Sequence, residues 1–228
     1  MKKILVVLLA GFVFLVLDSC KDRKGGSGSD EDSLGVNLGE IPDSLRMQQR
    51  IDSFRLTEVS KDTLLTQLTR EVLTAFKTKN YSKLDSLIHP AEGVRFSPYG
   101  TVHTEEDRKF TREAFKKLTS SGRNKKINWG SFDGSGDEIL LTPEEYFKKF
   151  VYDANFVRPE KYAINSFIGE GNSRNNLKAA YGDGDFTESY FSGSKKYGGM
   201  DWKSVRLVFK PVQGRYYLVG VVHDQWTI

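Results

Sequence analysis

The chain has 228 residues and a formal net charge of +4, with acidic and basic residues interspersed rather than grouped. A nucleic-acid-binding surface usually concentrates Lys and Arg, so we expect no nucleic-acid partner. Cys20 is the only cysteine, and the fold must therefore be held by its core rather than by disulfide bonds. The length after a leader segment suits one domain that buries roughly 70% of the surface its unfolded chain exposes.

The N-terminus has the pattern of an export signal. Two lysines precede an almost unbroken apolar run over residues 4–17, which is too short to span a hydrocarbon core of roughly 30 Å. The run leads into Leu17-Asp18-Ser19-Cys20, which resembles the lipobox of bacterial lipoproteins, although Asp18 replaces the small residue usually found there. The alternatives are an uncleaved membrane anchor and a secretory signal that contains a chance cysteine.

The lipobox resemblance implies that Cys20 is acylated and becomes the mature N-terminus. The mature protein would then have no free thiol, which excludes thiol catalysis and thiolate metal sites. We expect residues 1–19 to be the signal peptide, residues 20–42 to be the acylated cysteine with a Gly-, Ser- and Asp-rich flexible linker, and residues 43–228 to be a single domain. The expected location is the bacterial cell envelope, lipid-anchored, on its periplasmic or surface-exposed side.

The domain begins with helical patterns. Ser60 is a predicted N-cap, and a broad apolar stripe follows it, formed by Leu64, Leu65, Leu68, Val72, Leu73 and Phe76. A shorter helix starting at Asp43 is expected before this one. Ser82 is expected to cap a further short helix that Pro90 terminates.

Two more helices are predicted from capping signals. Thr104 and Asp107 form a variant capping box before Phe110, Ala114, Phe115 and Leu118. Thr142 and Glu145 form a stronger one, with Pro143 at the first helical position.

Alternating apolar and polar residues predict strands around residues 94–99, 205–210 and 217–221, with further strands expected at 128–132 and 186–191. The segment Lys210–Arg215 has the turn chemistry of an antiparallel hairpin. Helices first and strands last predict an α+β fold, in which N-terminal helices pack on a curved, mostly antiparallel sheet.

This order of elements is similar to the cone-shaped domain of the nuclear transport factor 2-like superfamily. Several strings also look like a family of uncharacterised bacterial envelope proteins, namely His89-Pro90, Gly93–Tyr99, Trp129-Gly130, Asp133–Gly136, Val151–Asp153 and His223–Ile228. The resemblance covers most of residues 55–228 and transfers no catalytic residue, because the cone superfamily contains isomerases, dehydratases, hydrolases and binding domains.

His223 is the main catalytic candidate. Its neighbour Asp224 points to the opposite face of a strand and cannot pair with it. If odd residues of this strand line the cone, His223 joins Tyr217 inside, and Asp153 or Arg95 becomes a suitable partner for general-base chemistry. The alternative is a hydrogen-bonded histidine at a sheet end, which is the commoner case.

Further site candidates are weaker. Arg95 sits among apolar neighbours and, if buried, needs a carboxylate or a bound anion. Tyr99 is a further catalytic or ligand-binding candidate, and Tyr152 and Trp226, together with Tyr146 and Trp129, suit an apolar pocket with polar tips. Core packing explains most such aromatic residues equally well.

Asp133, Ser135 and Asp137 imitate the alternating oxygen ligands of a calcium loop, with Glu144 at the twelfth position. Glu138 occupies the position where such loops need glycine, so we predict a loop between a strand and a helix instead of a metal site. No cofactor is expected. The sequence favours a membrane-tethered, non-catalytic module that binds a small ligand, a glycan or an envelope protein, and the alternative is a small cone-type hydrolase or isomerase using His223.

Overall fold

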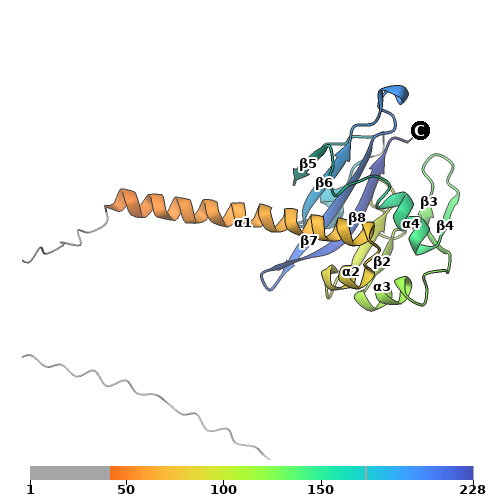
Figure 1. Cartoon of the computed structure of the whole chain (residues 1–228), viewed down its shortest axis with the longest axis horizontal. Helices are drawn as coiled ribbons and strands as arrows, with labels where there is room; N and C mark the ends of the chain where they lie inside the picture. The colour runs from red at the N-terminus through yellow and green to blue at the C-terminus, as the bar shows by residue number, and fades with distance from the viewer. Residues whose placement is uncertain (1–41, 173, 228) are drawn as a thin grey trace, which may run out of the picture. The chain divides into compact units, whose positions relative to one another are not determined.

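A six-stranded sheet forms the centre of the fold (Figure 1). The computed structural model describes residues 42–172 and 174–227, and Cys20 with the predicted signal and linker lies outside them. In spatial order the strands are β2 (Arg108–Phe110), β1 (Val94–Ser97), β8 (Arg215–Gln225), β7 (Lys203–Val212), β6 (Asp185–Phe191) and β5 (Lys161–Ile164). β1 and β8 run parallel, and the other neighbours are antiparallel. The predicted α+β class is confirmed.

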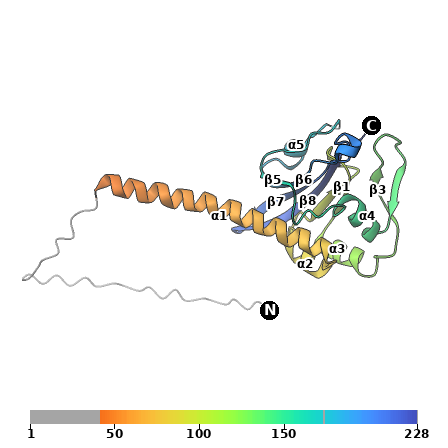
Figure 2. The same cartoon turned by 45° about the horizontal axis from the view of Figure 1, so that its top comes forward.

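The remaining elements surround this sheet (Figure 2). The helices are α1 (Asp43–Lys77), α2 (Tyr81–Leu87), α3 (Arg112–Thr119), α4 (Pro143–Phe150), α5 (Leu177–Tyr181) and the 3-10 turn η1 (Lys195–Tyr197). β3 (Ile127–Ser131) and β4 (Glu138–Leu141) form a separate two-stranded sheet. No helix in the described ranges is long and apolar enough to cross a membrane.

The two helices predicted before residue 78 are one continuous helix, α1. The predicted N-cap at Ser60 is wrong because this stretch contains neither proline nor glycine, and nothing interrupts its backbone hydrogen bonds. The buried side is formed by Leu65, Val72, Leu73, Ala75 and Phe76. Leu64, which was expected in the stripe, is 48% exposed.

Two other predicted caps are displaced. α2 begins before Ser82, because the Asn80 side chain accepts a hydrogen bond from the Lys83 N–H (3.1 Å) and caps the helix. α3 is capped by Thr111 instead of Thr104. Asp107 is used elsewhere, since its buried carboxylate accepts hydrogen bonds from the Ser97 hydroxyl and the His103 N–H.

The capping box at the start of α4 is confirmed. Thr142 accepts from the Glu145 N–H (3.3 Å), and the Glu145 carboxylate accepts from the Thr142 N–H (2.8 Å). Pro143 occupies the first helical position, where no N–H is needed. This cap stabilises the first turn of α4.

The sheet carries an apolar core on each face. Helices α1 to α4 cover one face, where the aromatic residues Phe76, Phe96, Phe115, Trp129, Tyr146, Phe147 and Phe150 pack together. α5 and the segment before it cover the other face, over Val102, Leu177, Tyr181, Phe186, Val208, Val219 and Val222. β7 serves both cores, since Leu207 belongs to the first and Val208 to the second.

The β7–β8 hairpin turns at Gln213 and Gly214, which both have positive φ, as a type I′ turn requires. Val208 pairs with Gly220 and Phe209 pairs with Leu218, so Val219 is an extra residue in β8. This bulge shifts the alternation of β8 by one residue. Tyr217, next to core-facing Leu218, therefore does not share a face with His223, and the prediction that the two line one interior is wrong.

Candidate functional site

His223 lies on the helix-covered face of the sheet and is 0% exposed. Its Nε2 is 3.3 Å from Asp153 Oδ1, and its Nδ1 is 3.3 Å from the Pro98 carbonyl oxygen. Phe150 packs edge-on against the imidazole, with ring centroids 5.9 Å apart. The predicted pairing of His223 with Asp153 is therefore seen as proximity, but His223 is closed from solvent and only 12% of the Asp153 side chain is exposed.

Asp153 also accepts a hydrogen bond from Lys203 Nζ at 2.6 Å. Burial alone would raise the pKa of the Asp153 carboxyl, but His223 and Lys203 outweigh it and lower that pKa. An ionised carboxylate held between two basic groups is typical of a structural ion pair. The arrangement positions Asp153 without leaving room for a substrate beside His223.

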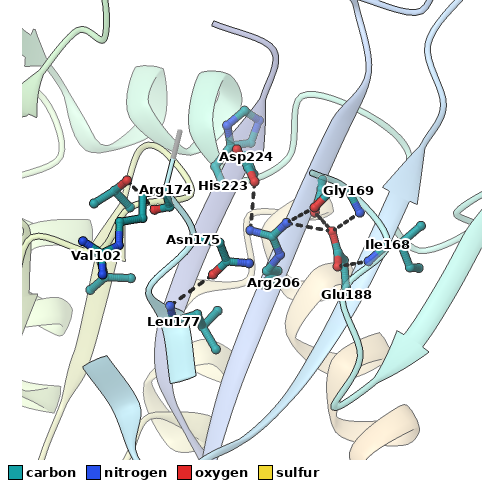
Figure 3. Close-up of polar contacts among 12 residues, drawn as sticks. Val102, Ile168, Gly169, Arg174, Asn175, Leu177, Glu188, Arg206, His223 and Asp224 are labelled. Carbon is teal, nitrogen blue, oxygen red and sulfur yellow. Dashed lines mark hydrogen bonds and ion pairs between the residues drawn. The ribbon is translucent and has the colours of Figure 1, made fainter. Parts of the chain in front are cut away.

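A second charged cluster lies on the other face of the same strands (Figure 3). Arg206 of β7 is 0% exposed and donates to Asp224 Oδ2 (2.9 Å) and Glu188 Oε1 (3.1 Å). The Ser204 hydroxyl donates to Glu188 at 2.5 Å. Arg206 is one of the polar residues in the alternating pattern that predicts this strand, and that pattern does not signal its burial.

The segment before α5 closes this cluster. The Glu188 carboxylate accepts from the Ile168 N–H (2.7 Å) and the Gly169 N–H (3.1 Å), while Arg206 donates to the Gly169 carbonyl (2.7 Å). Burial raises the pKa of Asp224, and Arg206 offsets this only in part. Charged hydrogen bonds thus pin an irregular segment to the sheet.

The same segment is held farther along at Val102. The Asn176 side chain accepts from the Val102 N–H (2.7 Å) and donates to the Val102 carbonyl (3.0 Å). The Thr101 hydroxyl donates to the Arg174 carbonyl (2.6 Å). These bonds join the segment to the loop after β1, so both clusters of contacts are structural.

An open pocket of about 190 Å³ lies between the loop after β1 and the β3–β4 hairpin. It is lined by Pro98, Tyr99, Thr101, His103, Glu106, Asp107, Gly130, Ser131, Phe132 and Asp133. Burial raises the pKa of the Tyr99 phenol, which keeps it protonated near neutral pH, and the Asp133 backbone offsets this only in part. Burial likewise raises the pKa of Asp107, against its hydrogen bonds from Ser97 and His103.

The predicted candidates Arg95, Tyr152 and Trp226 do not join this pocket. Arg95 donates to the carbonyls of Thr104 (2.6 Å) and Asp107 (3.0 Å), so it stabilises a turn. The Tyr152 hydroxyl donates to Asn155 Oδ1 (2.8 Å), and Trp226 is 37% exposed beyond β8. His223, Arg95 and Tyr99 therefore do not converge on one concave site.

The loop carrying Asp133, Ser135 and Asp137 joins β3 to β4, and the expected strand-to-helix connection is wrong. Gly136 donates to the Phe132 carbonyl (2.9 Å) and Ser135 accepts from the Asp137 N–H (3.2 Å), which closes a hairpin. Within residues 42–172 and 174–227, no three acidic, histidine or cysteine side chains gather as metal ligands would.

The comparisons with known proteins are sparse. No protein-family model matches the chain, and no curated protein matches it. Among solved structures, it is similar to a DUF4783 family protein from Bacteroides ovatus ATCC 8483, known from a crystal structure at 1.40 Å resolution. The two are 13% identical with a TM-score of 0.31, and the match covers 69% of this chain and 94% of that one.

Proposed function

We propose that this protein is an envelope lipoprotein, anchored through acyl groups on Cys20, whose α+β domain is a non-catalytic binding module. The observation that carries the binding role is the open pocket around Tyr99, which combines hydroxyl groups, carboxylates and aromatic rings. Such a set of hydrogen-bonding groups and ring faces suits a polar ligand. We retain the nuclear transport factor 2-like resemblance as part of this proposal.

The size of the pocket limits the ligand. At about 190 Å³ it is smaller than the roughly 300–1,000 Å³ typical of sites for drug-sized molecules. A nucleotide or a large cofactor would not fit within it. A single sugar ring or another small polyol would, and its hydroxyl groups would find acceptors at Glu106 and Asp107 and a donor at Tyr99.

The alternative, a small hydrolase or isomerase using His223, has weaker support. Its favourable observation is the 3.3 Å approach of His223 to Asp153. Against it, Phe150 and Pro98 enclose the imidazole, and neither His223 nor Asp153 lines the open pocket around Tyr99. A general base must lie within hydrogen-bonding distance of its substrate, and the residues that enclose His223 prevent a substrate from coming that close.

The ligand proposal is tested by measuring thermal stability of the full chain in detergent against monosaccharides, disaccharides, small polyols and divalent ions. A ligand at 100 times its dissociation constant adds about 2.7 kcal/mol, a shift of several degrees. Tyr99→Phe and Glu106→Gln should reduce that shift. Tyr197→Phe and Glu170→Gln, at exposed positions outside the pocket, should leave it unchanged.

If no compound raises the unfolding temperature, the small-ligand proposal is contradicted. A ligand that raises it equally in the parent protein and in both pocket variants would also contradict the proposal. The anchor is tested separately with Cys20→Ala. Loss of acylation should leave an unprocessed precursor. Normal processing of the variant, together with the absence of an acyl group from Cys20 of the parent protein, would contradict lipid anchoring.

A further inference from the structure

Positive charge is concentrated in residues 108–126, contrary to the interspersed pattern described for the chain as a whole. Eight of the 34 basic residues but one of the 30 acidic residues lie there, which gives the segment a formal charge of +7. The rest of the chain therefore carries −3, since the total is +4. The whole positive excess of the protein lies in β2, α3 and the turn leading into β3.

The basic side chains of this segment are free of ion pairs among the described residues. Arg108, Lys109, Lys116, Lys117, Arg123, Lys125 and Lys126 are exposed and together define the basic surface. Some lysines elsewhere are paired with acids, as Lys61 is with Asp185 (2.8 Å) and Lys83 with Glu71 (2.9 Å). Arg112 alone is partly buried, where it donates to the Ile88 carbonyl (2.7 Å).

The elements that carry the basic surface are neighbours in space. β2 is an edge strand of the six-stranded sheet, and α3 follows it directly and packs beside α2 (Figure 1). The Arg108 side chain donates to the Asn128 carbonyl and so links β2 to β3. These contacts hold the unpaired cations on a folded surface, where their mutual repulsion is offset only when an anionic partner binds.

We propose that this basic surface binds the phosphate headgroups of anionic lipids in the membrane that carries the tether. The inference rests on the proposed anchor but not on the ligand pocket. Polybasic surfaces near a bilayer are attracted by its anionic lipids, and tethering keeps the domain within reach of them.

The composition of the surface favours lipid over nucleic acid. Five of its seven members are lysines, whose ammonium groups act as point charges and lack the planar fork with which arginine reads bases and single phosphates. Single-stranded nucleic acids also need exposed aromatic rings for stacking. Within residues 108–126, Phe115 is buried and Phe110 is half-buried against the core.

The test uses the full chain mixed with vesicles of phosphatidylcholine alone or of phosphatidylcholine with phosphatidylglycerol, followed by amine labelling and mass spectrometry. Lys109, Lys116, Lys117, Lys125 and Lys126 should be labelled several times more slowly on the anionic vesicles. The protection should vanish in about 1 M salt, where the Debye length is roughly 3 Å. Flotation of the chain with the neutral vesicles reports the tether independently.

A matched pair of variants separates the surface from net charge. Replacing Lys116, Lys117, Lys125 and Lys126 by Gln should abolish the protection of Lys109. Replacing Lys148, Lys149, Lys195 and Lys196 by Gln removes the same charge from exposed positions elsewhere and should leave it intact.

Three outcomes would overturn the proposal. Equal labelling on both vesicle types, with flotation intact, means that the surface does not bind lipid although the tether works. Protection by inorganic phosphate on neutral vesicles indicates a discrete anion site instead. Protection by RNA in detergent, without protection by anionic vesicles, identifies a nucleic-acid surface. A chain that does not float with the neutral vesicles contradicts the anchor, whereas protection of the five lysines on the anionic vesicles still supports the basic surface and its absence still overturns it.

Discussion

Two charged clusters occupy opposite faces of β7 and β8, and they differ in how completely they are buried. Arg206, Glu188 and Asp224 are sealed beneath the segment before α5. His223 is buried as well, but the other two members of its cluster are partly exposed, with 12% of the Asp153 side chain and 34% of the Lys203 side chain accessible. A fully buried charge that loses a partner cannot be solvated by water in its place, whereas a partly exposed charge can.

The largest effect should come from Arg206→Met. It leaves the Glu188 and Asp224 carboxylates buried without their cation, which costs about 3–5 kcal/mol. Lys203→Met on the same strand should cost less than about 1 kcal/mol, since that lysine is at the rim. Urea unfolding measures both, and similar losses for the two variants would refute the contrast drawn between the clusters.

Gly100→Ala should cause the next largest loss of stability. A Cβ at Gly100 would lie 2.7 Å from Asp224 Oδ2, so the carboxylate must move away from Arg206. Overpacking of this kind costs about 1–3 kcal/mol. In an Asp224→Ala background the same substitution should cost clearly less, and an unchanged cost in this double-mutant cycle would locate the strain elsewhere.

The two clusters should respond to acid with opposite signs. The folded-state pKa of Asp153 is lowered from 3.8, so its contribution to stability is present above that pH and is lost as pH falls through the lowered value. The pKa of Asp224 is raised, so its ionised form costs stability above that raised value, and acidification toward 3.8 relieves this cost.

Unfolding free energies measured from pH 7 down to about pH 3 should therefore show a shrinking difference between the parent protein and Asp153→Asn. The pH-dependent part of the difference for Asp224→Asn should change in the other direction. Parallel curves for the two variants would contradict the assigned pKa directions.

The smallest effect is expected for a buried polar group outside both clusters. The Tyr146 hydroxyl is buried and has no hydrogen-bond partner among the described residues. Tyr146→Phe should therefore change the unfolding free energy by less than about 0.5 kcal/mol or raise it. Tyr152→Phe loses a 2.8 Å bond to Asn155 and should cost about 0.5–1.5 kcal/mol, so the order of the two variants is the test.

Local chemistry was predictable from the sequence where neighbours in the chain decide it. The capping box at Thr142 and Glu145 and the type I′ turn at Gln213 and Gly214 are of this kind. Ser60 and Thr104 can also act as caps, but Ser60 lies inside the unbroken helix α1 and Thr104 lies in the turn closed by Asp107. The short strands β2 and β5 were missed because their partners in the sheet define them.

The sites were less predictable than the fold. Alternation in β7 places Arg206 on the other face of the sheet from Val205 and Leu207. Nothing in the Gly- and Asn-rich segment before α5 signals that this segment will cover the face that carries Arg206. The approach of His223 to Asp153 joins residues 70 positions apart, and the sequence supplied Asp153 as one of two partners. The basic surface can be found from the local charge of residues 108–126, but the net charge of the whole chain conceals it.

The extra residue in β8 makes strand length a determinant of chemistry. Without this bulge, an unbroken alternation that kept Leu218 in the core would place Asp224 instead of His223 among the aromatic rings. Deleting Val219 would remove the extra residue and leave Leu218 and His223 on the same face of the sheet. The bulge therefore allows a strand with one residue too many to direct its histidine into one core and its carboxylate toward the other.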